Sequence, residues 1–466
     1  MKKVSLDEVL AYREKRSNRR KELLSEYPLP LACLGLNIPG EYKDFPWARR
    51  CFHEETEAFK LALEAEGLAI SYEEWEEENS GYTAYVSVDA APETLKALAL
   101  RLEDTHPLGR LFDIDIHEPG GTKLSRHGTR QCLVCTESAF VCARSRAHTP
   151  EELSAAILRI MENFFRQKLS DRVCSAALWA MMSEAAITPK PGLVDRANNG
   201  AHTDMDFFTF IDSTSVLLPW FRNCALAGFN SGSGVSGSGV DPQSLFQSLR
   251  PPGKEAELLM GKATGAVNAH RGYIFSLGLL SAAYGRLYRN EEKPDLAAVI
   301  EFVKAMTATL EADFAGSRAG EGFAKKFSHG EAVYNKSGIR GIRGEVSRGF
   351  PSVINHALPL LSTLLKDGHS LNDAGVAVLL KLLAYAEDTN LIHRGSLETL
   401  GALQEELRSF FADKADMKRI KDKAAALDKD FISRGLSPGG SADLLGVTLF
   451  LFRLFECGHR PCQNSK

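Results

Sequence analysis

The sequence predicts two domains: an α+β domain with a mixed sheet over residues 1–165, and a mostly or wholly α-helical domain over residues 166–466. Three observations support this division. In the first third, stretches of β-branched and aromatic residues alternate with a period of two, as half-buried strands do. After about Ala156 the apolar residues recur instead at the i, i+3, i+4 spacing of amphipathic helices. A length of 466 residues also favours two to three domains.

The first domain combines helices with two convincing strands. Residues 5–8 form the capping box S-x-x-E, which predicts a helix that runs to about Leu24. The alternating segments GYTAYVSVD (81–89) and LFDIDIHE (111–118) predict strands, and residues 91–104 between them predict a helix.

The second domain follows a helical connector between Thr149 and Asp171 that contains no Pro/Ser-rich linker. The apolar spacing predicts helices over residues 171–187, 207–228, 254–265, 296–313, 353–366, 373–386 and 441–456. The Gly/Ser tract over residues 231–239 predicts a flexible loop to which we assign no chemistry.

Composition and charge exclude several classes of protein. Apolar residues make up 44% and charged residues 25% of the chain, which are ordinary globular values. A net charge of −4 gives no overall attraction to nucleic acid or to anionic membranes. The N-terminus lacks the features of a signal peptide, and the longest apolar stretch (273–285) is too short to span a bilayer. Nine scattered cysteines indicate reduced thiols rather than a disulfide framework. We therefore expect a cytoplasmic protein.

Two aspartates in the first domain suggest metal-dependent chemistry. On a strand, Asp113 and Asp115 would project from the same face, a few ångströms apart. Such carboxylates repel one another unless a cation lies between them, and a bridging divalent metal is what nucleotidyl-transfer sites use. A nucleotidyltransferase-like domain is thus one interpretation. The other is a pair of solvated aspartates on an edge strand, which is the better interpretation of this pattern taken alone.

The segment after these aspartates mixes arginines with cysteines. Arg126, Arg130, Arg144 and Arg146 could grip phosphates, because the guanidinium fork matches phosphate oxygens. A zinc site of the Cys₃His type is also possible, with the ligands Cys132, Cys135, Cys142 and His148. Because apolar residues surround Cys142 in the sequence, we favour buried thiols over zinc. The basic run over residues 13–21 is either a solvated helix face or a docking face for an acidic protein.

In the second domain, five polar, glycine-containing clusters interrupt the helices. They cover residues 188–208, 255–272, 338–350, 386–395 and 437–445. Each could be a surface loop, and the last could be a simple helix cap. Their shared mixture of carboxylates, arginines and amides favours a metal–polyphosphate site. The candidate metal ligands are Asp195, Asp204, Asp206, Asp388 and Asp443. The candidate phosphate or sugar ligands are Lys190, Arg196, Asn198, Asn199, His202, Asn268, Arg340, Arg343, Asn390, Arg394, Gly439, Gly440 and Ser441.

These clusters resemble a known enzyme family. The five motifs, in order, are TPKPGLVDRANNGAHTDMD, AELLMGKATGAVNAHRG, GIRGEVSRGFP, DTNLIHRG and SPGGSADLL. Together they resemble triphosphoribosyl-dephospho-CoA synthase, which makes the precursor of the citrate lyase prosthetic group, and the likeness covers about residues 171–456. One departure is Ala269-His270-Arg271-Gly272, where the family has Thr-His-Lys-Gly.

Residues 1–165 resemble a second family, phosphoribosyl-dephospho-CoA transferase, also called holo-citrate lyase synthase. The matching segments are LNIPG, HPLGRLFDIDI, SRHGTRQCLVC and CARSRAH. The chain thus resembles a fusion of two successive enzymes.

The resemblance implies two reactions. In the C-terminal domain, the 2′-hydroxyl of 3′-dephospho-CoA would attack C1 of the ATP ribose and release adenine, with Mg²⁺ or another divalent cation on the triphosphate. Glu257 and His270 are our candidates for the base and the acid. In the N-terminal domain, a serine of the citrate lyase acyl carrier (gamma) subunit would attack the α-phosphate and release pyrophosphate. Asp113 and Asp115 would bind the metal there, and Arg110, Arg126 and Arg130 would bind phosphate.

Two other interpretations compete with this one. The same pair of reactions could serve malonate decarboxylase, which has related maturation enzymes. Alternatively, the chain could be a zinc-stabilised binding or scaffold protein held by the cysteines. The scaffold interpretation leaves the five C-terminal clusters without an explanation.

Overall fold

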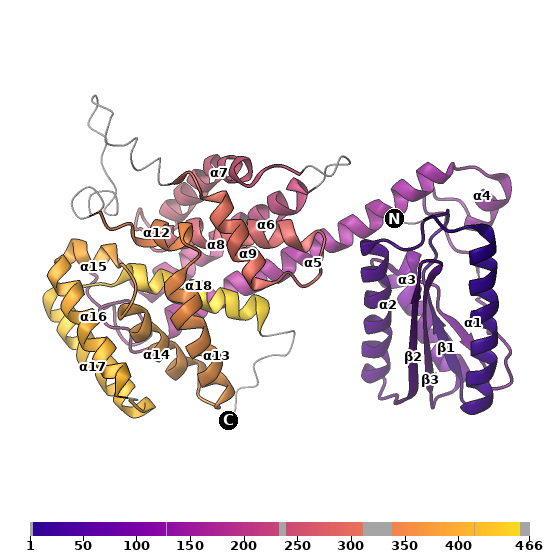
Figure 1. The fold of residues 1–466 in the computed structure, drawn as a ribbon, viewed down its shortest axis with the longest axis horizontal. Helices are drawn as coiled ribbons and strands as arrows, with labels where there is room; N and C mark the ends of the chain where they lie inside the picture. Colours follow the sequence, from indigo (N-terminus) through magenta and orange to yellow (C-terminus); the bar gives the residue numbers. More distant parts are fainter. Residues whose placement is uncertain (1–2, 127, 233–238, 311–337, 414, 457–466) are drawn as a thin grey trace. The chain divides into compact units, whose positions relative to one another are not determined.

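The computed structural model describes residues 3–126, 128–232, 239–310, 338–413 and 415–456, which fall into two units, residues 1–167 and 168–466 (Figure 1). A single helix, α5 (Pro150–Ala186), begins in the first unit and ends in the second. Within the described residues, no helix combines the length and the apolar character needed to cross a membrane.

The first unit is built on an antiparallel sheet of four strands. The strands are β1 (Leu31–Leu34), β2 (Ile70–Glu78), β3 (Gly81–Val88) and β4 (Asp115–His117). Their order is β2-β3-β1-β4, and each neighbouring pair is antiparallel, so the expectation of a mixed sheet was wrong. The strand expected over residues 81–89 is β3. The strand expected over residues 111–118 is shorter, because a 3₁₀ turn (Gly109–Leu111) occupies its start.

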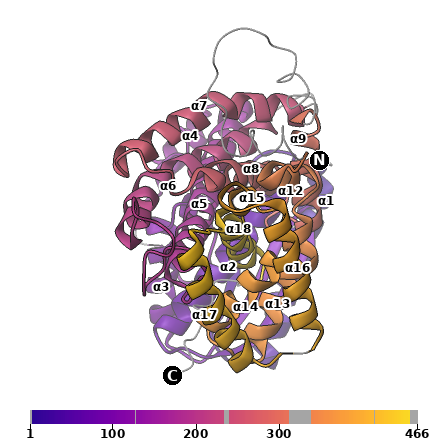
Figure 2. The ribbon, with the colours of Figure 1, turned by 90° about the vertical axis from the view of Figure 1, so that its left-hand side faces the viewer.

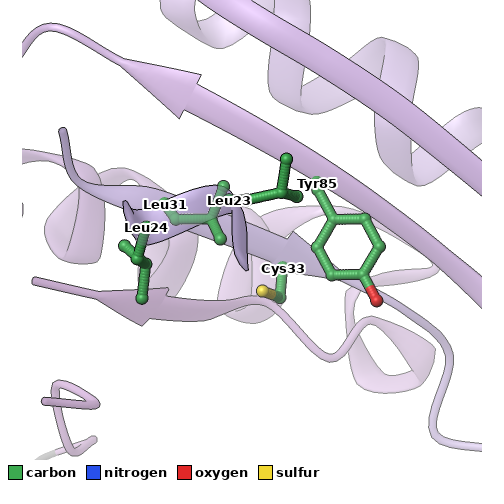
Figure 3. Close-up of a cluster of buried hydrophobic side chains, with 5 residues drawn as sticks. All are labelled: Leu23, Leu24, Leu31, Cys33 and Tyr85. Carbon is green, nitrogen blue, oxygen red and sulfur yellow. The ribbon is translucent and has the colours of Figure 1, made fainter. Parts of the chain in front are cut away.

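Helices cover both faces of this sheet. Helix α1 (Leu6–Glu26) lies on one face, and α2 (Pro46–Ala65) and α3 (Pro92–Thr105) lie on the other (Figure 1). From β1 to β4 the order is βαββαβ, the split βαβ arrangement of ferredoxin-like domains. On the α1 side, Leu23 and Leu24 pack against Leu31, Cys33 and Tyr85 of the sheet (Figure 3). This core fixes β1, which carries β4 on its other edge.

The basic run of α1 is partly used inside the unit. Lys15 pairs with Glu78 at 2.6 Å, and Arg19 pairs with Glu74 at 2.6 Å, both on β2. Opposite charges therefore align α1 along the acidic strand β2. These two side chains are committed to the chain's own carboxylates, which weakens the idea that the whole run is a docking face.

The second unit contains no strand among its described residues. Besides the end of α5, its helices are α6 (Phe207–Ser231), α7 (Pro242–Ala263), α8 (Arg271–Tyr288), α9 (Leu296–Met306), α12 (Gly341–Ser347), the π-helical turn η2 (Val353–Ala357), α13 (Leu358–Lys366), α14 (Leu371–Leu383), α15 (Thr389–Arg394), α16 (Leu397–Ala412), α17 (Met417–Arg434) and α18 (Gly439–Phe455). The predicted helices correspond to members of this set. Residues 311–313 of one predicted helix and 233–238 of the predicted loop lie outside the described residues.

Helix α18 lies in the middle of the second unit, among α8, α13, α14 and α15 (Figure 2). Leu445, Val447, Leu449, Phe450 and Leu451 on this helix are completely buried. A helix that is apolar on all sides belongs in the interior of a large domain. The position of α18 brings the glycine-rich segment before it next to the other polar clusters.

Candidate active sites in two units

The loop that begins at Thr188 is shaped by Asp195. Its buried carboxylate accepts hydrogen bonds from the hydroxyl of Thr188 at 2.5 Å and from the backbone N–H of Lys190 at 2.9 Å. It also accepts from the N–H groups of Ala197, at 2.6 Å, and Asn198, at 3.1 Å. Four donors occupy both oxygens, so Asp195 orders the loop and has little capacity left for a metal.

Beneath this loop lies a buried ion pair. The Nζ of Lys190 is 2.6 Å from Oε1 of Glu184, near the end of α5, and both side chains are almost fully buried. The sequence placed Lys190 among the phosphate ligands but gave no reason to select Glu184, which lies in the apolar last part of α5. In the structure Lys190 neutralises Glu184, and a bound anion would have to compete for it.

Three of the polar clusters meet at Arg394 and His202. Arg394 donates to the carbonyl oxygen of Ala201 at 3.0 Å and to His202 Nδ1 at 3.3 Å. Because arginine only donates, Nδ1 is the acceptor and Nε2 carries the ring proton. The Nε2–H group donates a hydrogen bond to Ser437 Oγ at 2.8 Å. Burial, with the charge of Arg394, lowers the pKa of His202, which keeps this imidazole neutral.

Asp388 joins two of these three clusters. One of its oxygens accepts the backbone N–H groups of Asn390 and Leu391, each at 3.0 Å, as the N-cap of α15. The other accepts the backbone N–H of Ser441 at 2.7 Å and its hydroxyl at 2.9 Å. The carboxylate therefore occupies the N-terminal turn of α18, the turn that the sequence suggested for an anionic ligand. A metal at Asp388 or a phosphate at Ser441 would have to displace the hydrogen bonds between these two residues.

Glycines allow the same clusters to approach closely. A Cβ atom at Gly439 would lie 2.5 Å from the side-chain amide of Asn390, and one at Gly341 would lie 2.7 Å from Thr389. Only glycine has no Cβ, so these positions let α18 and α12 pack directly against the segment that starts α15. The cluster with Arg340 and Arg343 is thereby placed beside the one with Asn390.

Asp443 faces the start of α8. A Cβ atom at Gly272 would lie 1.9 Å from an Asp443 carboxylate oxygen, so the carboxylate fills the space left by this glycine. The first turn of a helix favours negative charge there. Burial, aided by the charges of Glu184 and Asp388, raises the pKa of Asp443 well above its usual range. Asp443 is therefore a partly buried carboxyl group beside two others, with a strong tendency to hold a proton.

His270 is buried next to this group. Its Nδ1 hydrogen bonds with Ser213 Oγ at 2.7 Å, and its ring stacks on Tyr273 at a centroid distance of 5.0 Å. Its Nε2 has no hydrogen-bond partner among the described residues. Burial, with the nearby charge of Lys190, lowers the pKa of His270 to about 3. A group with such a low pKa is a poor proton donor at neutral pH, which argues against His270 as the acid.

Several predicted residues lie towards the surface. Glu257 pairs with Arg271 at 3.0 Å, and the side chain of Asn268 accepts the N–H of Arg271 at 3.2 Å. Asp206 is the N-cap of α6, where it accepts the N–H of Thr209 at 2.9 Å. Asp204 is exposed and lies 3.6 Å from His202 Nδ1.

The remaining loop residues also contact the chain itself. Arg196 donates to the Asn372 side chain at 2.9 Å. Asn198 donates to Asp428 at 3.2 Å and accepts the N–H of Gly200 at 2.7 Å, while Asn199 is exposed.

A cavity of about 640 Å³ adjoins the Thr188 loop. Its apolar wall includes Trp179, Met182 and Phe207, and its polar wall includes Arg196 and Asn372. Volumes of this size are typical of small-molecule sites, in which a few polar groups orient a mostly apolar contact surface. The cavity and the converging clusters together form the candidate site of the second unit.

In the first unit, Asp113 lies where β1 and β4 meet. Its backbone N–H donates to the carbonyl of Gly35 at 2.7 Å and to the carboxylate of Glu55 at 3.1 Å. Burial, with the neighbouring charge of Asp115, raises the pKa of Asp113, although Arg130 and Lys123 oppose this shift. Asp115 pairs with Lys123 at 2.6 Å. The sequence did not single out Glu55, whose pKa is raised by complete burial.

The predicted arginines are anchored on α3 and on the chain around Asp113. Arg126 pairs with the buried Glu103 at 2.9 Å, and Arg130 pairs with the other oxygen of the same carboxylate. Glu103 in turn accepts the N–H of Ile114, between the two aspartates, at 3.0 Å. Arg110 donates to the carbonyls of Gln131 and Cys132, the latter at 2.8 Å. All three arginines thus hold the backbone around Asp113 and Asp115 in place.

The cysteines that follow come together. One ligand atom from each of Cys132, Cys135, Cys142 and His148 can be chosen so that all four lie within 4.8 Å of one another. Cys132 and Cys142 are buried, as the sequence suggested, and the four side chains also lie close enough together to hold a metal ion. Among the described residues, no other set of three or more such side chains gathers this closely, so the candidate carboxylates of either unit do not form a ready-made metal cage.

Comparisons with known proteins assign the two units. Residues 4–164 match the family model for apo-citrate lyase phosphoribosyl-dephospho-CoA transferase, and residues 170–461 match the one for ATP:dephospho-CoA triphosphoribosyl transferase. Protein CitXG of Haemophilus influenzae is 32% identical over 96% of both chains. This chain belongs to the CitXG family. Protein CitXG of Leuconostoc mesenteroides is also 32% identical, over 97% of each chain.

A second kind of relative resembles only part of this chain. The 2-(5''-triphosphoribosyl)-3'-dephosphocoenzyme-A synthase of Klebsiella pneumoniae is 38% identical over 60% of this chain and 90% of its own. The chain is accordingly an enzyme, a transferase with a domain from each of two families concerned with the citrate lyase prosthetic group. The resemblance noted in the sequence is confirmed.

Proposed function

We propose that the second unit joins ATP to 3′-dephospho-CoA with release of adenine, and that the first unit attaches the product to citrate lyase. The product of the first reaction is 2′-(5″-triphosphoribosyl)-3′-dephospho-CoA. In the second reaction a serine of the acyl carrier subunit takes up the phosphoribosyl-dephospho-CoA group and pyrophosphate leaves. The observation that carries the proposal is the meeting of clusters far apart in sequence, around Asp443, Asp388 and Arg394, inside the unit that matches the synthase family.

Asp443 is our candidate base for the synthase step. The oxygen–carbon bond to the ribose forms as the carbon–nitrogen bond to adenine breaks. The hydroxyl proton moves to a carboxylate of sufficient basicity and is passed on to the departing nitrogen, so that adenine leaves as the neutral base. The raised pKa of Asp443 gives it that basicity, and its place at the start of α8 stabilises its charged form. Glu257, the candidate from sequence, is paired with Arg271 and is therefore less suited.

The triphosphate requires positive charge that remains through the reaction. Arg196 lies within the Thr188 loop, Arg394 contacts this loop at Ala201, and Arg340 and Arg343 lie beside the start of α15. We assign phosphate binding to these arginines. The cavity beside Trp179 and Phe207 would hold an aromatic or alkyl part of a substrate, with Arg196 and Asn372 at its polar wall.

Mg²⁺ fits this site only as a partner of the nucleotide. The described carboxylates do not form a cage of three ligands, and Asp195 and Asp388 already accept four hydrogen bonds each. Magnesium commonly binds through one or two carboxylates plus substrate phosphates and water. Because Asp443 is assigned as the base, the exposed Asp204 is the carboxylate left for that role. When bound, the ion would neutralise phosphate charge.

In the first unit, we assign the base for the carrier serine to Asp113. The serine oxygen forms a bond to the α-phosphorus while the bond to pyrophosphate breaks, and the serine proton passes to the carboxylate. The raised pKa of Asp113 makes its carboxylate a suitable acceptor for this proton. Asp115 remains our candidate metal ligand. Arg126 and Arg130 support both aspartates through Glu103, besides adding positive charge near the phosphates.

The test of the synthase reaction follows adenine. Purified protein is incubated with ATP, Mg²⁺ and 3′-dephospho-CoA, and free adenine is measured by chromatography. Adenine should form only when both substrates are present. The apo-carriers of citrate lyase and of malonate decarboxylase are then added separately, and their mass increase is measured. No adenine from folded protein would contradict the first reaction, and modification of the malonate decarboxylase carrier alone would contradict the assignment of the second.

A further inference from the structure

The side chains of the cysteine cluster, defined as Cys132, Cys135, Cys142 and His148, converge from three separate pieces of backbone. Cys132 and Cys135 lie on a tight hairpin in which Gln131 pairs with Ser138. Cys142 lies on the short helix α4 (Ala139–Ser145), and His148 comes just before the capping box that starts α5. Three backbone segments would not bring four metal-binding side chains to one point merely to bury thiols.

The distances match a tetrahedral metal site. Cys135 Sγ lies 3.5 Å from Cys142 Sγ and 3.3 Å from His148 Nε2. Zinc bound to sulfur at about 2.3 Å and to nitrogen at about 2.0 Å in a tetrahedron separates its ligand atoms by about 3.5–3.8 Å. The backbone N–H of Val134 also points at Cys132 Sγ, at 3.5 Å, as suits a sulfur that carries negative charge.

The segment has little else to hold it together. The large apolar side chains next to the ligands point outward: Phe140 is 65% exposed and Val141 is 52% exposed. Cys132 and Cys142 are buried instead. A piece of chain whose interior consists of metal ligands and whose apolar residues face outward is typical of small metal-stabilised modules.

We propose that this cluster binds one zinc ion, with Cys132, Cys135, Cys142 and His148 as its four ligands. Three sulfurs and one imidazole are a set that zinc accepts in structural sites, where four protein ligands fill the coordination sphere. The ion has no place left for a substrate, so its role is structural. It holds the hairpin, α4 and the start of α5 together.

The zinc site supports the candidate active site of the first unit. Arg110, three residues before Asp113, donates to the carbonyl oxygen of the zinc ligand Cys132. Arg130, two residues before Cys132, donates to the carbonyl of Phe112 at 2.9 Å. Loss of zinc would release both contacts and loosen the backbone around Asp113. Its effect on catalysis rests on the proposed function, whereas zinc binding itself does not.

The test measures zinc first. Protein purified without a metal-binding tag, in reducing buffer, should contain about one zinc per chain by elemental analysis. X-ray absorption should show three sulfur neighbours and one nitrogen neighbour. Cys135→Ser and His148→Ala should lower the zinc content at least fivefold, and His148→Cys should restore it. Cys174→Ser, a thiol of the second unit, should retain zinc and serves as the matched control.

The activities provide the second measurement. Zinc removal by a thiol-reactive mercurial should lower carrier transfer at least tenfold while adenine release, which occurs in the other unit of the same chain, stays within twofold. Zinc below 0.1 per chain in zinc-supplemented, fully reduced protein would overturn the proposal. So would an unchanged zinc content in Cys135→Ser, or a Cys135–Cys142 disulfide found in place of zinc. Normal zinc with no carrier transfer in any variant would contradict the proposed function and leave the zinc site standing.

Discussion

Asp388→Asn separates a structural role of this carboxylate from a metal-binding role. The carboxylate accepts four hydrogen bonds and connects the start of α15 to the first turn of α18. The asparagine oxygen can serve the N–H groups of Asn390 and Leu391. Its NH₂ group would then face the backbone N–H of Ser441, and a flipped amide only moves the mismatch to the other side. The first orientation leaves one backbone N–H without an acceptor, that of Ser441, and the flipped one leaves two, those of Asn390 and Leu391.

The expected cost follows from these bonds. A buried donor without a partner costs about 1–3 kcal/mol, and the bonds that remain lose the strengthening that an ionised acceptor gives. We expect Asp388→Asn to lower the free energy of unfolding of the second unit by about 2–4 kcal/mol. The control is Ser441→Ala, which removes only the hydroxyl bond and should cost about 0.5–1.5 kcal/mol.

The assay is a urea titration read by pulsed hydrogen exchange of peptides from α14 and α18, so that only the second unit is followed. Adenine release is measured in parallel below the unfolding midpoint. If Asp388→Asn unfolds at the wild-type midpoint yet has lost Mg²⁺-dependent adenine release, then the carboxylate acts as a ligand and our structural account of it is wrong.

Three further predictions concern the second unit. The pKa of His270 is about 3 in the folded state and about 6.5 in the unfolded one, so between these pH values the unfolded chain binds one more proton and stability falls as the pH drops below 6.5. We expect the free energy of unfolding to fall by about 2 kcal/mol between pH 7.5 and pH 5, and to fall by less in His270→Gln. Urea midpoints with the same pH dependence in both proteins would refute this. Gly272→Ala should push Asp443 aside and reduce adenine release at least tenfold, whereas Gly261→Ala, with no atom within 4 Å of the new methyl group, should leave the rate unchanged. Lys190→Met should destabilise the unit by about 3–5 kcal/mol because it leaves Glu184 charged and buried, and adding Glu184→Leu should recover part of this in a urea titration; no recovery in the double variant would contradict the buried pair.

The sequence predicted those strands and helices whose apolar residues recur with a clear period. The alternation in residues 81–89 predicted β3, although nearly every residue of that strand is buried because helices cover both faces of the sheet. Strand β2 carries a glutamate at most positions, so its apolar alternation is weak, and β1 has only four residues. Antiparallel pairing of β4 with β1 depends on contacts across about eighty residues, which sequence spacing does not encode.

The sequence identified polar residues that do come together in the fold, but it did not predict which groups they contact there. Asp388 looked like a metal ligand because its partner Ser441 lies 53 positions away, and only folding brings them together. Glu184 was missed because its helix shows no polar signal, although it pairs with Lys190. In the cysteine cluster the apolar neighbours of Cys142 suggested a buried helix, yet Phe140 and Val141 are exposed and the sulfurs face one another.

The central claim is that one chain carries two separate active sites, and complementation between variants tests it most directly. Asp113→Asn should release adenine normally but fail to modify the acyl carrier. Asp443→Asn should fail to release adenine but modify the carrier when the triphosphoribosyl intermediate is supplied. Asparagine at position 443 removes a carboxyl whose raised pKa disfavours its charge, so this variant should fold. Mixing the two variants with ATP and 3′-dephospho-CoA should restore carrier modification, whereas loss of both activities in either folded variant would contradict the two-site account.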